Sequence, residues 1–191
     1  MARTHSKAAT TLDDLLNRAK TRPPIRVAVV AADQALVLQT IKQATSLGLI
    51  VPRLIGDPDA ILAGAKEIGL TIRRETIIAA NSEAEAARAG VDLVRSGDAD
   101  AVMKGYIHTD ILMRALLDST RGLRIPGQRV SHVFMIDIPS YPKLLAVTDA
   151  AINITPDLTA KQQILQNAVA LLHRLGTTTP KVAVLSAVET V

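Results

Sequence analysis

The sequence predicts an α/β fold: a doubly wound, mostly parallel sheet, followed by a second α/β domain that is entered by an antiparallel hairpin. Short runs rich in Val, Ile and Ala alternate with amphipathic segments, which is typical of parallel strands connected by helices. The runs are apolar at consecutive positions, as expected for strands that are covered on both faces. After residue 124 two apolar runs are separated only by "PSYP", so these two strands are predicted to be antiparallel. The predicted domains are residues 1–124 and 125–191.

The first predicted domain alternates helices and strands. Four of its helices begin at capping signals, which are Thr11 with Asp14, Asp33, Asp57 followed by Pro58, and Ser82 with Glu85. The helices are predicted at 11–19, 34–49, 57–69, 82–97 (ended by Gly97) and 109–118. The strands are predicted at 26–32, 50–56, 76–80 and 100–105. Ligands in such sheets bind beyond the carboxyl ends of the strands, which directs attention to the residues after 104.

The second predicted domain begins with strands at 130–138 and 143–150. A long amphipathic helix follows at 157–176, opened by a Thr159–Gln162 capping box, and then a buried strand at 181–188. That strand stops close to the end of the chain. Because a core strand needs neighbours that cover it, we expect this domain to be truncated.

Composition excludes several classes of function. The 191 residues are 48% hydrophobic, which suffices for a packed core. Cysteine is absent, which excludes disulfides, cysteine-ligated zinc and a cysteinyl acyl-enzyme. The net charge of +4 forms no basic stripe and aromatic residues make up only 2%, so nucleic-acid binding is not expected. No apolar run approaches the roughly 18 residues of a membrane span and no secretory signal precedes the first apolar segment, so we expect a cytoplasmic protein.

Four polar or special residues gather where the strand at 100–105 passes into the next helix. Lys104 offers a point charge for a phosphate, and Gly105 would let a ligand approach a backbone with free N–H groups. His108 can donate a hydrogen bond or a proton near neutral pH, and Thr109 is the expected helix cap. The alternative is a lysine that reaches solvent, a turn glycine and an ordinary Thr cap. No GxxxxGK[ST] or GxGxxG phosphate loop is present.

A second group of polar residues ends the strand at 143–150. Thr148 and Asp149 terminate the apolar run, and Asn153 follows four residues after Asp149. Asp149 is a candidate base, or a group that orients a substrate. The alternative is an aspartate that accepts hydrogen bonds from its own loop in an Asx-turn.

A third group, Arg129, Ser131 and His132, stands at the entry of the strand at 130–138. Ser131 and His132 are adjacent, so their side chains point to opposite faces and cannot form a nucleophile–base pair. There is no GxSxG elbow either, and a serine hydrolase is therefore not predicted. The four histidines lack the spacing of metal ligands, so no metal is predicted.

Three stretches together resemble a known family: "MKGYIHTDILMRALL", "RVSHVFMIDIPSYPKLLAVTDAAINITPDLTAKQQILQNAV" and "PKVAVLSAVETV". From about residue 25 to the end, the chain resembles the phosphate acetyl/butyryltransferases, and most of all the transferase part of bifunctional enoyl-CoA hydratase/phosphate acetyltransferases. The resemblance implies an isocitrate-dehydrogenase-like fold of two α/β domains around a cleft, usually in a homodimer. It also implies reversible transfer of an acetyl or butyryl group between CoA and inorganic phosphate, with CoA as a substrate and no cofactor. The family's C-terminal segment, which carries an aspartate thought to act as base, is not found in this sequence.

The resemblance locates the candidate site in the three groups. From the chemistry of these residues we expect a catalytic set, His108, Asp149 and Asn153, and a substrate-binding set, Lys104, Gly105, Thr109, Arg129, Ser131 and Thr148. The partners expected are acyl-CoA and phosphate. One alternative is a non-catalytic protein that binds CoA or acyl phosphate. Pyridine-nucleotide dehydrogenases share the architecture but need clustered metal-binding aspartates, which are not apparent in the sequence.

Overall fold

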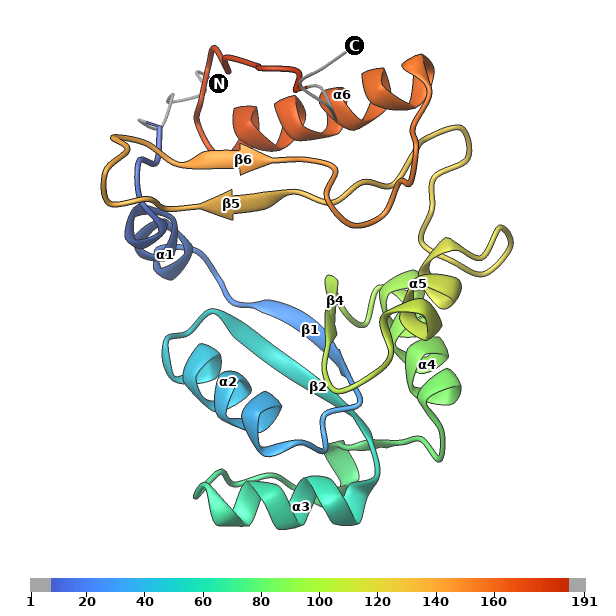
Figure 1. Ribbon diagram of the computed structural model, residues 1–191. Coiled ribbons are helices and arrows are strands. Elements are labelled where there is room, and N and C mark those ends of the chain that lie inside the picture. The colour runs from blue at the N-terminus through green and yellow to red at the C-terminus, as the bar shows by residue number, and fades with distance from the viewer. Residues whose placement is uncertain (1–7, 186–191) are drawn as a thin grey trace. The chain divides into compact units, whose positions relative to one another are not determined.

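The computed structural model describes residues 8–185 and divides them into two compact units (Figure 1). One unit is residues 18–127, and the other is residues 128–185 together with residues 8–17. The break after Gly127 lies near the predicted boundary at residue 124. The N-terminal residues 8–17 differ from the predicted division, because they group with the second unit.

A four-stranded parallel sheet forms the middle of the unit 18–127. In chain order, the strands and helices of this unit are β1 Ile25–Val30, α2 Ala35–Ser46, β2 Ile50–Gly56, α3 Pro58–Glu67, the 3-10 helix η1 Arg74–Thr76, β3 Ile78–Ala79, α4 Glu83–Ser96, β4 Ala101–Lys104 and α5 Thr109–Leu117. The strand order is β3-β2-β1-β4, and every neighbouring pair is parallel, as the sequence predicts. The order reverses between β1 and β4. In open α/β sheets, the carboxyl edge at such a reversal is where ligands bind.

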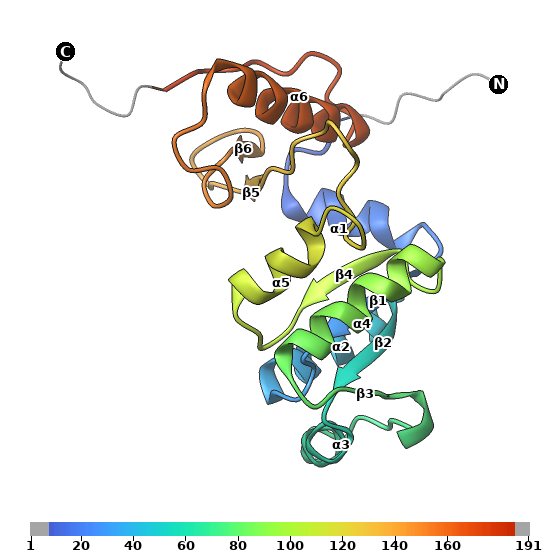
Figure 2. The same ribbon diagram turned by 90° about the vertical axis from the view of Figure 1, so that its right-hand side faces the viewer.

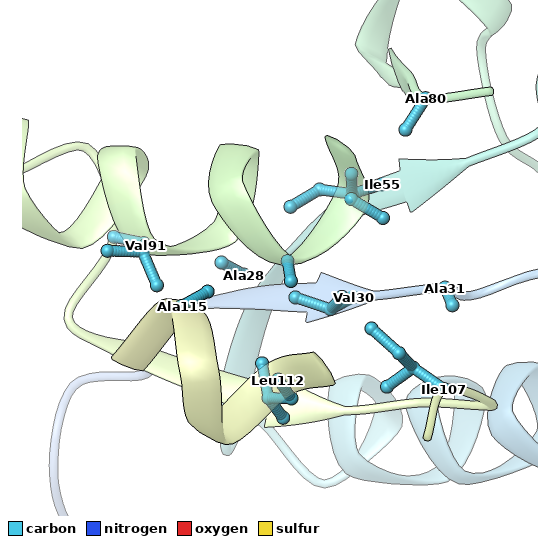
Figure 3. Close-up of a cluster of buried hydrophobic side chains, with 12 residues drawn as sticks. Ala28, Val30, Ala31, Ile55, Ala80, Val91, Ile107, Leu112 and Ala115 are labelled. Atoms are coloured by element: carbon cyan, nitrogen blue, oxygen red, sulfur yellow. The ribbon is translucent and has the colours of Figure 1, made fainter. Parts of the chain in front are cut away.

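Helices cover both faces of this sheet (Figure 2). Successive residues of β1 point to opposite faces, so Ala28 and Val30 enter one apolar cluster while Val27 and Val29 enter the other. The first cluster lies under α4 and α5 (Figure 3), and the second lies under α2 and α3. This double cover explains why β1 is apolar at consecutive positions.

Some helix caps in this unit confirm the sequence prediction. The side chain of Asp57 accepts hydrogen bonds from the first turn of α3, with Pro58 as the first helical residue. The Ser82 hydroxyl caps α4 by accepting from the N–H of Glu85, and Gly97 ends α4 in the left-handed conformation. In return, the carboxylate of Glu85 accepts from the N–H of Asn81 at 2.8 Å.

Two predicted caps in this unit are wrong. The N-cap of α2 is Gln34 and not Asp33, because the chain turns after β1 at Ala31, which has a positive φ of 54°, and the helix begins later than its sequence signal. The N-cap of α5 is His108, and Thr109 is already the first helical residue. His108 has extended backbone angles, and its N–H is hydrogen-bonded to Glu83, a residue 25 positions earlier.

Among its described residues, the second unit contains a hairpin and two helices. These elements are α1 Leu12–Lys20, β5 Phe134–Ile136, β6 Leu145–Val147 and α6 Leu158–Arg174. The last three residues of α1, 18–20, belong to the unit 18–127. The two strands are antiparallel, as predicted, and pair Phe134 with Val147. Thr11 and Asp14 exchange hydrogen bonds at the start of α1, which confirms that capping pair. For α6 the predicted cap is wrong, because Asp157 precedes the predicted Thr159 and caps the helix first.

The predicted strand at 181–188 is wrong in the part that the structure describes. Residues 181–185 form no strand, and the side chains of Val184 and Leu185 are 83% and 87% exposed. A strand requires a neighbouring strand for its N–H and C=O groups, and none of the described residues supplies one. Residues 186–188 lie outside the described part. Within residues 8–185, no helix has the length and hydropathy needed to cross a membrane.

Candidate functional site

The chain after β4 stays attached to the centre of the sheet. The N–H of Gly105 donates to the carbonyl of Val30 at 2.9 Å, and the N–H of Tyr106 donates to the carbonyl of Ala31 at 3.0 Å. Ile107 is buried in the cluster under α4 and α5, close to Ala31 and Leu112 (Figure 3). These contacts fix the loop 104–108 at the carboxyl edge of the sheet, where the strand order reverses.

Side chains of this loop alternate between the core and the solvent. Gly105 is half-buried and Ile107 is buried, whereas the residues on either side of each, Lys104, Tyr106 and His108, are exposed. The inward positions anchor the loop. The outward positions present a cation, a phenol and an imidazole to solvent.

Gly105 has a structural reason to be a glycine. A Cβ at this position would lie 2.3 Å from the carbonyl oxygen of Ala31 and 2.4 Å from that of Val30. The N–H groups of Gly105, Tyr106 and His108 are not free, because they donate to the carbonyls of Val30 and Ala31 and to the carboxylate of Glu83. Close approach of two backbones therefore accounts for the glycine, and its predicted role in binding substrate stays a prediction.

His108 forms an ion pair with Glu83, the first residue of α4. Nδ1 of His108 lies 2.9 Å from Oε2 and 3.0 Å from Oε1 of Glu83, and Oε2 also accepts the N–H of His108 at 3.1 Å. The hydrogen bond and the negative charge of Glu83 raise the pKa of His108 above its ordinary value. The hydrogen bonds from the ring and from the backbone of His108 lower the pKa of Glu83.

Lys104 and Thr109 complete this group, which we call the β4 cluster: Glu83, Lys104, Gly105, His108 and Thr109. Lys104 is exposed, and its positive charge lowers the pKa of both Glu83 and His108. Thr109 is exposed at the first position of α5. The His108 side chain makes no capping hydrogen bond to α5, whose first-turn N–H groups lie at the start of the helix. The cluster combines two nitrogen donors with one carboxylate.

In the second unit, the carboxylate of Asp149 organises the loop that follows β6. It accepts hydrogen bonds from five N–H groups: the backbone N–H of His132, Ala151, Ile152 and Asn153, and the side-chain amide of Asn153. Burial raises the pKa of Asp149, but the hydrogen bonds from Asn153 and the backbone outweigh it and lower the pKa overall. Such a carboxylate is a weak base, and its geometry resembles the Asx-turn alternative.

Side chains from three segments meet beside Asp149. Nη1 of Arg129 donates to Oδ1 of Asn153 at 2.9 Å, and the Thr148 hydroxyl donates to the carbonyl of His132 at 2.7 Å. From α6, Nδ2 of Asn167 donates to the carbonyl of Arg129 at 2.8 Å and to the hydroxyl oxygen of Ser131 at 2.9 Å. We call this group the β6 cluster: Arg129, Ser131, Thr148, Asp149, Asn153 and Asn167.

The predicted absence of a Ser131–His132 pair is confirmed. The Ser131 oxygen accepts from Asn167, whereas the ring of His132 packs edge-on against Phe134 with 4.2 Å between centroids. Nδ1 of His132 is buried and has no hydrogen-bond partner among the described residues.

The structure therefore gathers the predicted site residues into two clusters, one in each unit. Two members were missed by sequence reasoning, Glu83 and Asn167. In the sequence, Glu83 looks like an ordinary acidic residue in the first turn of a helix. Its predicted position at the carboxyl edge of the sheet could have indicated that it belongs to the site. Asn167 gave no signal beyond its position outside the apolar face of α6.

Replacing Asn167 by Ala is expected to lower the free energy of unfolding by about 1–2 kcal/mol, because two hydrogen bonds to Arg129 and Ser131 are lost. Thermal unfolding monitored by circular dichroism measures the change. Gln166→Ala is the matched control, since Gln166 is the exposed preceding residue of the same helix. Equal effects of the two substitutions would show that Asn167 does not hold the cluster.

Comparison with known proteins identifies the family. The sequence pattern of the family described as phosphate acetyl/butaryl transferase matches residues 75–191, more than half of the chain. The chain belongs to this family. The matched segment includes all residues of the β4 cluster and of the β6 cluster, and family membership confirms the resemblance seen in the sequence.

Individual relatives support the assignment. The chain is 47% identical to a phosphate acetyltransferase of Rhizobium meliloti over 150 residues, which cover 78% of this chain and 47% of that protein. It is 37% identical to a phosphate butyryltransferase of Clostridium beijerinckii over 179 residues, covering 94% and 59%. The chain thus spans about half the length of the curated relatives it matches.

A solved structure confirms the fold prediction. The crystal structure of a branched-chain phosphotransacylase from Enterococcus faecalis V583 matches with a TM-score of 0.67 and 29% identity. The match covers 87% of this chain and 57% of that one.

Proposed function

We propose that this protein transfers a short acyl group, acetyl or butyryl, between CoA and inorganic phosphate. The observation that carries the proposal is the β4 cluster, which places Lys104 and His108 at the carboxyl edge of a parallel sheet where the strand order reverses, within the segment that matches the family. The relatives are named for acyl transfer with phosphate.

The chemistry of the clusters suits this reaction. A phosphate oxygen attacks the acyl carbonyl, the carbon–sulfur bond breaks, and the CoA sulfur leaves as a thiolate that takes up a proton. Lys104 and protonated His108 are cations that stabilise phosphate and the oxyanion formed at the carbonyl. Arg129 offers a guanidinium for a second anionic group. The hydrogen bonds of Asp149 favour a role in holding Asn153 and its loop rather than in taking a proton.

Direct transfer from CoA to phosphate requires no cofactor and no metal, and CoA enters as a substrate. We further propose that the protein acts as a homodimer in the cytoplasm, with acyl phosphate as product. Light scattering coupled to gel filtration measures the oligomeric state.

The decisive experiment follows free CoA thiol released from acetyl-CoA or butyryl-CoA as a function of phosphate concentration. Lys104→Ala is expected to reduce the phosphate-dependent rate by about 10- to 100-fold, because a hydrogen bond to a charged group contributes about 1.5–3 kcal/mol. The control is Lys66→Ala, an exposed lysine at the end of α3.

Two outcomes would contradict the proposal. An active protein in which Lys104→Ala and Lys66→Ala behave alike would remove Lys104 from phosphate binding. Calorimetric binding of CoA without any thiol release from acyl-CoA would favour the non-catalytic alternative.

A further inference from the structure

Glu83 holds His108 at two points. Its Oε2 accepts the backbone N–H of His108 at 3.1 Å, and the same carboxylate contacts Nδ1 of the ring at 2.9 Å. The first contact fixes the N-cap of α5 and the second fixes the rotation of the ring. One carboxylate on α4 therefore determines both the position and the orientation of an imidazole on another element.

This contact also determines which ring nitrogen exchanges its proton. An ionised carboxylate only accepts hydrogen bonds, so Nδ1 of His108 must carry hydrogen to bind it. In the neutral ring, Nε2 is then the unprotonated nitrogen, and it becomes the second N–H when the ring is protonated. The His108 side chain is 78% exposed while Glu83 is only 33% exposed. Nε2 has no hydrogen-bond partner among the described residues.

We propose that Glu83 is a positioning residue of the candidate site: it binds the Nδ1–H of His108, so that in the protonated ring Nε2–H is left to donate a hydrogen bond to an anionic substrate oxygen. The inference rests on the acyl transfer proposed above, in which that oxygen belongs to phosphate or to the oxyanion at the acyl carbon. It assigns a role to a carboxylate that makes no contact with substrate itself.

The charges around His108 support this arrangement. Three groups act on the ring: Glu83 from α4 and Asp110 from α5 raise the pKa of His108, and Lys104 from β4 lowers it. The net shift is upward, so a larger fraction of His108 is the donating cation at neutral pH. The pKa of Glu83 is lowered, so the ion pair is lost when the pH falls through the pKa of Glu83 or rises through that of His108.

A purely structural ion pair would be a weaker explanation. Salt bridges between exposed side chains contribute little to stability because water and salt screen them. The bond from Glu83 to the ring also adds little to helix capping, since the backbone N–H of His108 is already bound by Oε2. The ring contact has its main consequence for the protonation of His108.

Titration of His108 by nuclear magnetic resonance tests the inference without requiring turnover. The full chain, labelled with 15N in its histidines, is compared with Glu83→Ala and with Glu85→Ala. Glu85 is the matched control, because it lies in the same first turn of α4 and its carboxylate binds Asn81 instead of His108. In Glu83→Ala, the titration midpoint of His108 is expected to fall and the neutral ring to change from the Nδ1–H to the Nε2–H form. In Glu85→Ala the Nδ1–H form is expected to remain.

Each outcome decides a separate point. If Glu83→Ala leaves the midpoint and the ring form unchanged, or if Glu85→Ala changes them equally, Glu83 does not position His108. A second titration adds inorganic phosphate to the unsubstituted chain, which is expected to raise the His108 midpoint because the anion favours the protonated ring. A midpoint that phosphate does not move would overturn the proposed binding of phosphate at His108, whichever result Glu83→Ala gives.

Discussion

Replacing Gly105 by Ala is expected to lower the free energy of unfolding of the unit 18–127 by about 3 kcal/mol, at the upper end of the usual cost of overpacking. The added Cβ would lie 2.3–2.4 Å from the carbonyl oxygens of Ala31 and Val30. These are backbone atoms of the central strand and of the residue after it, so they cannot move aside as a side chain can. Relief requires breaking the hydrogen bonds that join Gly105 to Val30 and Tyr106 to Ala31.

Denaturant unfolding of the full chain measures this loss, and hydrogen exchange of the Gly105 and Tyr106 amides locates it. Gly64→Ala provides the matched control, because its Cβ would come closest to the end of the Leu38 side chain, at 2.8 Å, with the nearest backbone atom at an ordinary contact distance of 3.9 Å, and Ala favours the helix by up to about 1 kcal/mol. We expect that variant to remain close to the parent in stability. Similar stability losses in both variants would contradict the close backbone approach at Gly105.

Replacing Asp149 by Ala is expected to lower the free energy of unfolding by about 2–3 kcal/mol, because several N–H groups lose their acceptor together. The substitution removes the partner of Asn153, whose side chain in turn accepts from Arg129. The β6 cluster is therefore expected to lose its arrangement as well as its stability. Thermal unfolding of the full chain measures the first effect, and chemical-shift changes at Asn153 and Asn167 measure the second.

Asp137→Ala is the control for this prediction, because the Asp137 carboxylate accepts one backbone N–H, that of Leu12, at 3.0 Å. A loss of about 1 kcal/mol is expected there. If Asp149→Ala were no more destabilising than Asp137→Ala, and Asn153 kept its chemical shifts, Asp149 would not organise the loop. That result would favour a role of Asp149 in proton transfer.

The sequence predicts the sheet well because its signals are local and repeated. Alternation of apolar runs and amphipathic segments indicates each strand and its crossover, and the short "PSYP" turn requires the antiparallel pair. Helix starts are predicted less well. Asp33, Thr109 and Thr159 are each suitable caps, but the chain's path after β1, the bond from Glu83 and the earlier Asp157 select other residues.

The candidate site could be predicted only in part. Lys104 ends a strand and His108 and Asp149 follow strands within a few residues, which a linear sequence shows directly. Glu83 and His108 are 25 residues apart and meet only because two helices begin at the same edge of the sheet. The protonation state and the orientation of His108 depend on that long-range contact, so sequence reasoning recovers the residue without its partner.

Along residues 104–108, positions that pack against the sheet alternate with positions that are exposed to solvent. Gly105 and Ile107 face the sheet and are constrained by backbone contact and core packing. The side chains of Lys104, Tyr106 and His108 are exposed and take no part in core packing, although the backbone N–H groups of Tyr106 and His108 are hydrogen-bonded. Changes of the outward side chains can therefore alter what the loop contacts, while the packing of Gly105 and Ile107 against the sheet is retained.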